Sequence, residues 1–175
     1  NQPQVALWNL AQFASCLIPL MGDEDTAIAA ATEAINGFTA VYEGEWLRRF
    51  GAKIGLARAT ADDADLIQRL LGLMADQGAD FTRTFRGLAE GMAAAEFADP
   101  TAFDGWARDW RDRLASEEAP DEIMRAANPA VIPRNHRVEE AIAAATGGDF
   151  APFDRLARVL STPFDLAPED APYTL

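Results

Sequence analysis

The sequence predicts an all-α fold of about seven or eight helices, packed in one irregular orthogonal bundle. Apolar residues recur at helical spacings of three and four along most of the chain, and no stretch alternates apolar and polar residues for long enough to indicate a strand. Proline, glycine and acidic residues stand where such helices would begin and end. A length of 175 residues is sufficient for one domain with a substantial core, so we expect residues 1–175 to form a single helical domain.

The first predicted helix covers about residues 5–20 and is apolar on most of its circumference. It carries no charged side chain, which favours a fully packed central helix. The only cysteine, Cys16, lies in this helix, and we expect a buried, inert thiol. A single cysteine allows neither an internal disulfide nor a cysteine-based zinc site. After a turn at Gly22, a long helix is predicted over about residues 26–50, ended by Gly51 and Gly55.

Capping signals locate the helices of the middle part. Thr60 followed by Asp63 resembles a capping box, Asp80 can cap a short helix, and Asp99 precedes a proline at a first helical position. The helix after Asp99 carries an aromatic stripe at spacings of three and four, which is typical of a core rather than of a ligand site. Its members are Phe103, Trp106, Trp110 and Leu114.

The last third predicts three shorter helices, over about residues 121–127, 136–146 and 151–160. The tail that follows, STPFDLAPEDAPYTL, is rich in proline and acid and is predicted to be extended. Asn135 is expected to cap the helix that begins next to it.

Composition excludes several classes of function. The formal net charge is −13 and the pI about 4.4, which argues against a nucleic-acid binder and against docking on anionic lipid. The uncharged N-terminal stretch contains polar residues and a proline, and so lacks the unbroken apolar run of about 18 residues that a membrane span needs.

Common catalytic and metal-binding motifs do not match. There is no Gly-x-Gly-x-x-Gly and no Gly-Lys-Ser/Thr. Asp23 and Asp25 begin like a calcium loop, but Ala27 and Ile28 stand where an oxygen ligand and a glycine belong. The single histidine excludes the two-histidine helical zinc motif. From the residues alone we predict no catalytic residue and no metal ligand.

The least ordinary segment is NPAVIPRNH, residues 128–136. Its two prolines bias the preceding residues toward extended conformations, and Val131 and Ile132 can fill a hydrophobic gap while the chain crosses between helices. Arg134, Asn135 and His136 are candidates for contact with a ligand or with another domain. Arg134 and His136 could instead hydrogen-bond carbonyl groups or meet an acidic neighbour, in which case the segment is only a connector.

The same segment, continued as NPAVIPRNHRVEEAI and followed by Gly148-Asp149, resembles the selenoprotein O/YdiU family of protein adenylyltransferases. Two other segments agree. NQPQVALWNLAQ at residues 1–12 is similar to the family's segment directly after its kinase-like catalytic core. FDRLARVLSTPFD at residues 153–165 is similar to its penultimate stretch. The three segments occur in the family's order and together cover nearly the whole chain.

For a complete protein, the resemblance implies a kinase-like fold that binds ATP in an inverted orientation. Such a protein transfers AMP to Ser, Thr or Tyr hydroxyls of protein substrates with Mg²⁺ or Mn²⁺, and bacterial members are cytoplasmic. The family's ATP-anchoring and metal-binding motifs precede the NQPQ segment, and its cysteine or selenocysteine end follows the last residues. We therefore expect this chain to be a C-terminal portion of such a protein, with no catalytic residue or cofactor of its own.

Two functional hypotheses follow. In the first, the chain is a helical support for the upstream kinase-like domain of the same polypeptide and helps to present its protein substrates. In the second, it is a free-standing helical protein–protein interaction module with an apolar groove. The apolar first helix predicts an exposed patch, or a dimer, for the isolated chain. A metal-free hydrolase built around His136 has no triad partners that can be named.

Overall fold

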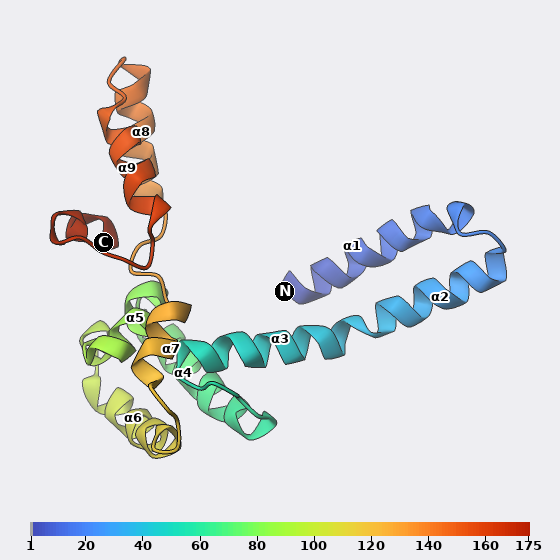
Figure 1. The fold of residues 1–175 in the computed structure, drawn as a ribbon, viewed down its shortest axis with the longest axis horizontal. Coiled ribbons are helices and arrows are strands. Elements are labelled where there is room, and N and C mark those ends of the chain that lie inside the picture. Colours follow the sequence, from blue (N-terminus) through green and yellow to red (C-terminus); the bar gives the residue numbers. More distant parts are fainter. Residues whose placement is uncertain (1) are drawn as a thin grey trace. The chain divides into compact units, whose positions relative to one another are not determined.

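The computed structural model describes residues 2–175, and every regular element in that range is a helix (Figure 1). Nine α-helices and four 3₁₀ segments, labelled η, are present among these residues, and no strand is found there. The all-α prediction is therefore confirmed. By their contacts the residues fall into two compact units, Asn1–Arg48 and Arg49–Leu175, called unit 1 and unit 2 below. The single bundle expected over residues 1–175 stays a prediction.

Unit 1 contains α1 (Gln2–Leu17), η1 (Ile18–Leu20), α2 (Glu24–Asn36) and most of α3 (Phe38–Lys53). The one helix predicted over residues 26–50 is in fact two, because α2 ends at Asn36, Gly37 caps it, and α3 begins directly after Gly37. Glycine is a poor helix former, so the interruption falls there. This division accounts for the ninth helix.

The α1 helix is more exposed than its composition predicts. It packs along α2 on one side, yet none of its side chains is buried, and Trp8 and Phe13 each expose 61% of their surface. The expectation of a fully packed helix is wrong for this chain, because α2 covers only one side of α1. Cys16 is likewise exposed and not buried. No helix within residues 2–175 has the length and apolar character to cross a lipid bilayer.

Unit 2 holds the larger core, built by α4 (Ala64–Gln77), α5 (Phe81–Glu90), α6 (Pro100–Leu114) and α7 (Pro120–Ala127). The aromatic stripe predicted on α6 lies in this core, since Phe103, Trp106 and Trp110 are all buried. Both indole N–H groups have acceptors: Trp106 donates to the Leu66 carbonyl and Trp110 to the Ile54 carbonyl, each at 2.8 Å. The core role of the stripe is confirmed.

The predicted caps are present at three helix starts. The Thr60 backbone N–H donates to the Asp63 carboxylate at 2.8 Å, in the reciprocal arrangement of a capping box. Asp80 accepts from the backbone N–H of Arg83 at 2.8 Å, and Asp99 caps α6. A side-chain acceptor at these positions satisfies backbone donors that have no partner within the helix.

The last part of unit 2 is a pair of adjacent helices, α8 (Asn135–Thr146) and α9 (Ala151–Ser161) (Figure 1). Residues 162–175, called the tail below, were expected to be extended. Instead they contain a 3₁₀ segment, η4 (Pro168–Thr174). Arginines of α8 and α9 contact this segment, as the next subsection describes, and the tail's composition does not reveal these contacts.

Candidate functional site

The segment that the sequence singles out, residues 128–136, leaves α7 and enters α8 across the interior of unit 2. Its first residue, Asn128, is 1% exposed. The Asn128 side-chain amide donates to the carbonyls of Lys53, at 2.8 Å, and Phe85, at 3.2 Å. Lys53 is the last residue of α3, where carbonyls lack a partner within the helix, so Asn128 caps that end from a distant part of the chain.

Lys53, the only lysine of the chain, faces the same asparagine. Its ammonium donates to the Ala127 carbonyl and to the Asn128 Oδ1, both at 3.2 Å. It also lies 5.6 Å from the ring centroids of Phe81 and Phe85. Burial lowers the pKa of Lys53. The ammonium is thus used to hold the start of the 128–136 segment, which is a structural role.

Two segments that carry the family resemblance meet in space. The backbone N–H groups of Ala130 and Val131 both donate to the Pro163 carbonyl, at 2.7 and 3.2 Å. Arg86 bridges the same two segments, because one guanidinium nitrogen donates to the carbonyls of Asn128 and Phe164, at 3.2 and 3.3 Å. The NPAV run and the STPFD run are therefore parts of one packed junction. Val131 is buried in it, as the gap-filling hypothesis predicts.

The three candidate residues of the segment have different surroundings. Arg134 forms a two-pronged ion pair with Asp80, at 2.7 and 3.0 Å, and also donates to the Thr174 carbonyl at 3.0 Å. Its guanidinium holds the pKa of the Asp80 carboxyl below its ordinary value. Asn135 and His136 are exposed. The expected Asn135 cap is wrong, because Asn135 is already the first residue of α8 and Arg134 occupies the cap position without a side-chain bond.

Arg134 therefore does meet an acidic neighbour and a backbone carbonyl, as one of the hypotheses for this segment required. Its Nε is buried without a hydrogen-bond partner among the described residues. A contact of the Arg134–His136 run with a ligand or with another domain stays a prediction.

A row of arginines on α8 and α9 holds the tail. Arg158 pairs with both oxygens of Asp170, at 3.0 and 2.8 Å, and the hydrogen bonds from Arg158 lower the pKa of Asp170. Arg137 and Arg155 donate to tail carbonyls at 2.8 and 2.9 Å. Their guanidinium carbons lie 5.7 and 5.5 Å from the Tyr173 ring centroid. Sequence reasoning missed this row, although an acidic tail next to a helix with arginines three residues apart was a signal for it.

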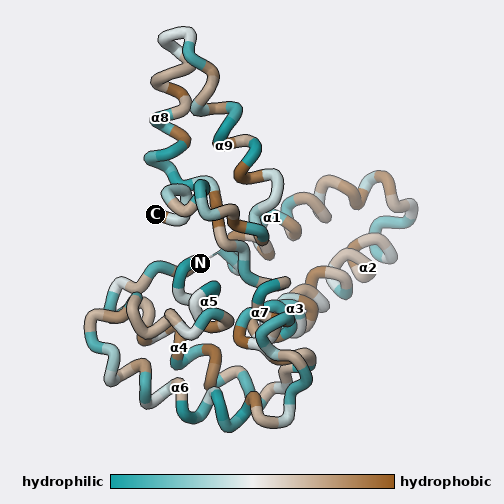
Figure 2. The backbone as a smooth tube through the Cα atoms, turned by 60° about the vertical axis from the view of Figure 1, so that its left-hand side comes forward, coloured by the Kyte–Doolittle hydropathy of each residue, from teal (hydrophilic) through white to brown (hydrophobic). Residues whose placement is uncertain are grey.

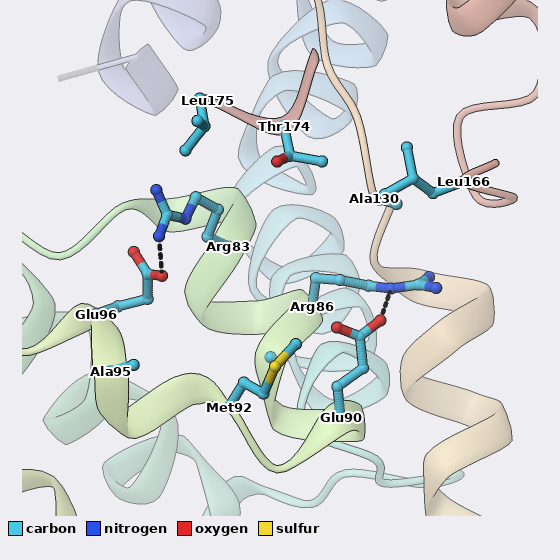
Figure 3. A pocket seen from close by; sticks show the side chains of 11 residues that line it. Arg83, Arg86, Glu90, Met92, Ala95, Glu96, Ala130, Leu166, Thr174 and Leu175 are labelled. Carbon is cyan, nitrogen blue, oxygen red and sulfur yellow. Dashed lines mark hydrogen bonds and ion pairs between the residues drawn. The ribbon is translucent and has the colours of Figure 1, made fainter. Parts of the chain in front are cut away.

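A cavity of about 400 Å³ lies between α5, η3 (Ala93–Glu96) and the tail (Figure 3). Two arginines line it, and each is paired with a carboxylate: Arg83 with Glu96 at 2.6 Å, and Arg86 with Glu90 at 2.7 Å. The remaining lining is largely apolar. Because each cation has its own anion, the cavity offers no unbalanced charge to attract a phosphate.

The residues that the structure describes include no group of three or more histidine, cysteine, aspartate or glutamate side chains placed to hold a metal ion. The Mg²⁺ or Mn²⁺ implied by the resemblance therefore has no such group of ligands among residues 2–175, and the expected absence of an ATP site stays a prediction. In the junction described above, Asn128, Arg86 and the backbone N–H groups of Ala130 and Val131 all form hydrogen bonds. The arrangement positions the helices of unit 2 relative to one another.

Comparison with known proteins identifies the relatives of this chain. The family model described as protein adenylyltransferase SelO matches residues 1–161. A protein nucleotidyltransferase YdiU of Ruegeria sp. (strain TM1040) is 51% identical over 165 residues, which are 94% of this chain and 35% of that relative. Proteins of the same name from Roseobacter denitrificans and Ruegeria pomeroyi are 49% and 48% identical, over 94% and 97% of this chain.

The chain spans only about a third of the length of these relatives, with 35% of the first two and 36% of the third. Within that third, the match is nearly continuous from the first helices to α9. The family model thus covers far more than half of the chain, and it includes all three segments on which the resemblance rests, except the last four residues of the third. This chain belongs to the SelO family of protein adenylyltransferases.

Proposed function

We propose that residues 1–175 form the C-terminal helical region of a protein adenylyltransferase. In this proposal the region is a single helical domain that supports a kinase-like catalytic core in the same polypeptide and supplies no catalytic residue itself. The complete protein transfers AMP from ATP to Ser, Thr or Tyr hydroxyls of protein substrates, with Mg²⁺ or Mn²⁺, in the bacterial cytoplasm.

One observation carries the supporting role: Asn128 and Arg134 of the family-like segment, and Arg86 beside it, are engaged in internal contacts. Asn128 binds three groups of α3 and α5, Arg86 joins two loops, and Arg134 is shared between Asp80 and the tail. Transfer of a phosphoryl-type group requires a metal site, an anion clamp and a positioned base together. Arg83, Arg86 and Arg134 are each paired with a carboxylate, so none of them is available as a free cation for such a clamp.

The test compares the full-length protein with residues 1–175, each incubated with a protein substrate mixture, Mg²⁺ and ATP labelled at the α-phosphate. We expect the full-length protein to transfer label to protein and residues 1–175 to transfer none. ATP labelled at the γ-phosphate is the control, since phosphate transfer would label protein from that nucleotide instead. Calorimetric titration of residues 1–175 with ATP and Mg²⁺ should show no tight binding.

The possible outcomes separate the hypotheses. Label transfer or tight, metal-dependent ATP binding by residues 1–175 alone would overturn the supporting role. A full-length protein that transfers neither label would overturn the adenylyltransferase assignment. A reading frame without a kinase-like core would favour the free-standing interaction module.

A further inference from the structure

The α1 helix has one face that the structure leaves uncovered. Val5, Trp8, Gln12, Phe13 and Cys16 follow one another at i, i+3, i+7, i+8 and i+11, so they lie on a single side of the helix. We call this side the outer face of α1. All five residues are exposed, and the three large apolar ones expose between 55% and 61% of their surface.

The opposite side of α1 is the one that α2 covers. Ala11 and Ala14 of α1 line a cavity of about 260 Å³ together with Ile18 of η1 and with Ile28 and Ile35 of α2. Because the covered side and the outer face lie on opposite sides of the same helix, contact with α2 leaves the outer face open. Within unit 1, α1 therefore packs on the side that faces α2, and its outer face stays open.

The chemistry of the outer face fits an apolar partner. No residue from Gln2 to Gly22 is charged, and apolar colours predominate along α1 in Figure 2. Large aromatic side chains exposed in a group, without charge around them, mark a surface that is normally covered. A charged or nucleic-acid partner would find nothing on this face to pair with.

The size of the face and the length of the relatives decide between two occupants. Val5, Trp8 and Phe13 together expose on the order of 350 Å². A stable dimer buries about 800 Å² on each partner, so the face alone is small for a second copy. A segment of the same polypeptide needs less area, because tethering already holds it at high effective concentration. The relatives are long enough to contain such a segment, since this chain spans 35% of the length of the first two.

We propose that the outer face of α1 is a docking surface for an apolar part of the full-length polypeptide that lies outside residues 1–175. The inference rests on the proposed function, and it names the surface through which the helical region joins the remainder of the protein. Trp8 and Phe13 are the anchors of this surface.

Hydroxyl-radical footprinting with mass spectrometry tests the proposal on the full-length protein and on residues 1–175. We expect Trp8 and Phe13 to be oxidised at least fivefold more slowly in the full-length protein. Equal oxidation rates of Trp8 in the two proteins would overturn the proposal. Slow oxidation of Trp8 in residues 1–175 alone would overturn it as well. Protection that rises with protein concentration, together with a dimer in light scattering, would assign the face to a second copy and also overturn it.

A matched pair of variants adds an independent readout at Cys16, which shares the outer face. In the full-length protein, Trp8→Ser combined with Phe13→Ser should raise the alkylation rate of Cys16 at least fivefold. Val41→Ser is the control, because Val41 is an apolar residue of α3 that is 68% exposed and lies outside α1. It should leave the rate unchanged. An unchanged alkylation rate of Cys16 in the folded double variant would contradict the proposal. If that variant does not fold, the footprint of the wild-type protein is the test of the proposal.

Neither readout depends on catalysis, so this inference and the proposed function fail separately. A protected Trp8 in a protein that transfers no AMP would leave the docking surface intact and remove the adenylyltransferase assignment. AMP transfer by a full-length protein with an unprotected Trp8 would support the adenylyltransferase assignment and remove the docking surface.

Discussion

Replacement of Asn128 by alanine perturbs the most buried polar contact of the junction in unit 2. The side chain of Asn128 makes three hydrogen bonds: it donates to the carbonyls of Lys53 and Phe85 and accepts from the Lys53 ammonium. Alanine makes none of them. The Lys53 carbonyl at the end of α3 is then left without its side-chain donor, and the ammonium keeps only the Ala127 carbonyl.

The magnitude follows from these bonds. A neutral hydrogen bond contributes about 1 kcal/mol net, and a buried carbonyl left without a donor costs about 1–3 kcal/mol. Asn128 is 1% exposed, so water does not replace the lost contacts without rearrangement. We therefore expect Asn128→Ala to lower the free energy of unfolding of unit 2 by about 2–4 kcal/mol. With an m-value of about 2 kcal/mol per M, the urea midpoint falls by about 1–2 M.

Urea denaturation of residues 1–175, followed by tryptophan fluorescence, measures this change. Trp106 and Trp110 lie in the core of unit 2 and report on its unfolding. Asn135→Ala is the matched control, because Asn135 belongs to the same segment but is exposed, and its side chain makes no hydrogen bond with the described residues. It should shift the free energy of unfolding by less than about 0.5 kcal/mol. Equal midpoints for the two variants would refute the structural role assigned to Asn128.

Three further predictions concern other contacts of unit 2, and the first of them compares two glycine variants. Gly87→Ala should destabilise by about 1–3 kcal/mol, because its Cβ would lie 2.8 Å from the Ala93 backbone nitrogen. Gly72 lies on α4 with open space around it, so Gly72→Ala should instead stabilise the protein by about 0.5–1 kcal/mol. Urea denaturation measures the free energy of unfolding of both glycine variants. Arg134 lowers the pKa of Asp80 in the folded protein. The ion pair therefore stabilises the folded state fully above the ordinary pKa of 3.8, and this stabilisation is lost as the pH falls through the lower pKa of the folded state. Asp80→Asn should therefore reduce the fall in urea midpoint that occurs below about pH 4. Asp170→Asn removes the charged partner of Arg158, so amide hydrogen exchange in the tail should become several-fold faster. Asp165→Asn is the control: it alters an exposed carboxylate and should leave the exchange rate unchanged.

These three predictions have clear contrary outcomes. A stable Gly87→Ala variant would mean that the close approach of α5 and η3 is absent. A pH dependence that Asp80→Asn leaves unaltered would place the acid-sensitive stability in other carboxylates. Equal exchange in the two aspartate variants would show that the arginine row does not hold the tail.

Local signals predicted most of the helices because the forces that start and stop a helix act within one turn. The capping box at Thr60 and the caps at Asp80 and Asp99 need only residues two to three positions away. The aromatic stripe on α6 was assigned to the core by its spacing alone. The division at Gly37 was missed, because glycine weakens a helix without always ending it.

The packing of α1 and of the tail was harder to predict, because the composition of each segment is compatible with more than one arrangement. The uncharged α1 looked like a buried helix, yet its outer face is exposed, since a helix can be covered only by the elements that are present. The tail looked extended, because proline and acid disfavour a core. Its 3₁₀ segment is in contact with Arg137, Arg155 and Arg158, whose reach from α8 and α9 no local pattern encodes.

The sequence by itself determined that this protein is helical, where most of its helices begin, and which family it resembles, because caps, periodicity and motif order are properties of neighbouring residues. Only the tertiary structure decided which polar groups meet. Asn128 and Lys53 are separated by 75 residues along the chain, and Arg134 and Asp80 by 54. Such pairs depend on how helices cross in space, and a helix of given sequence can direct the same side chain toward many partners until its packing selects one.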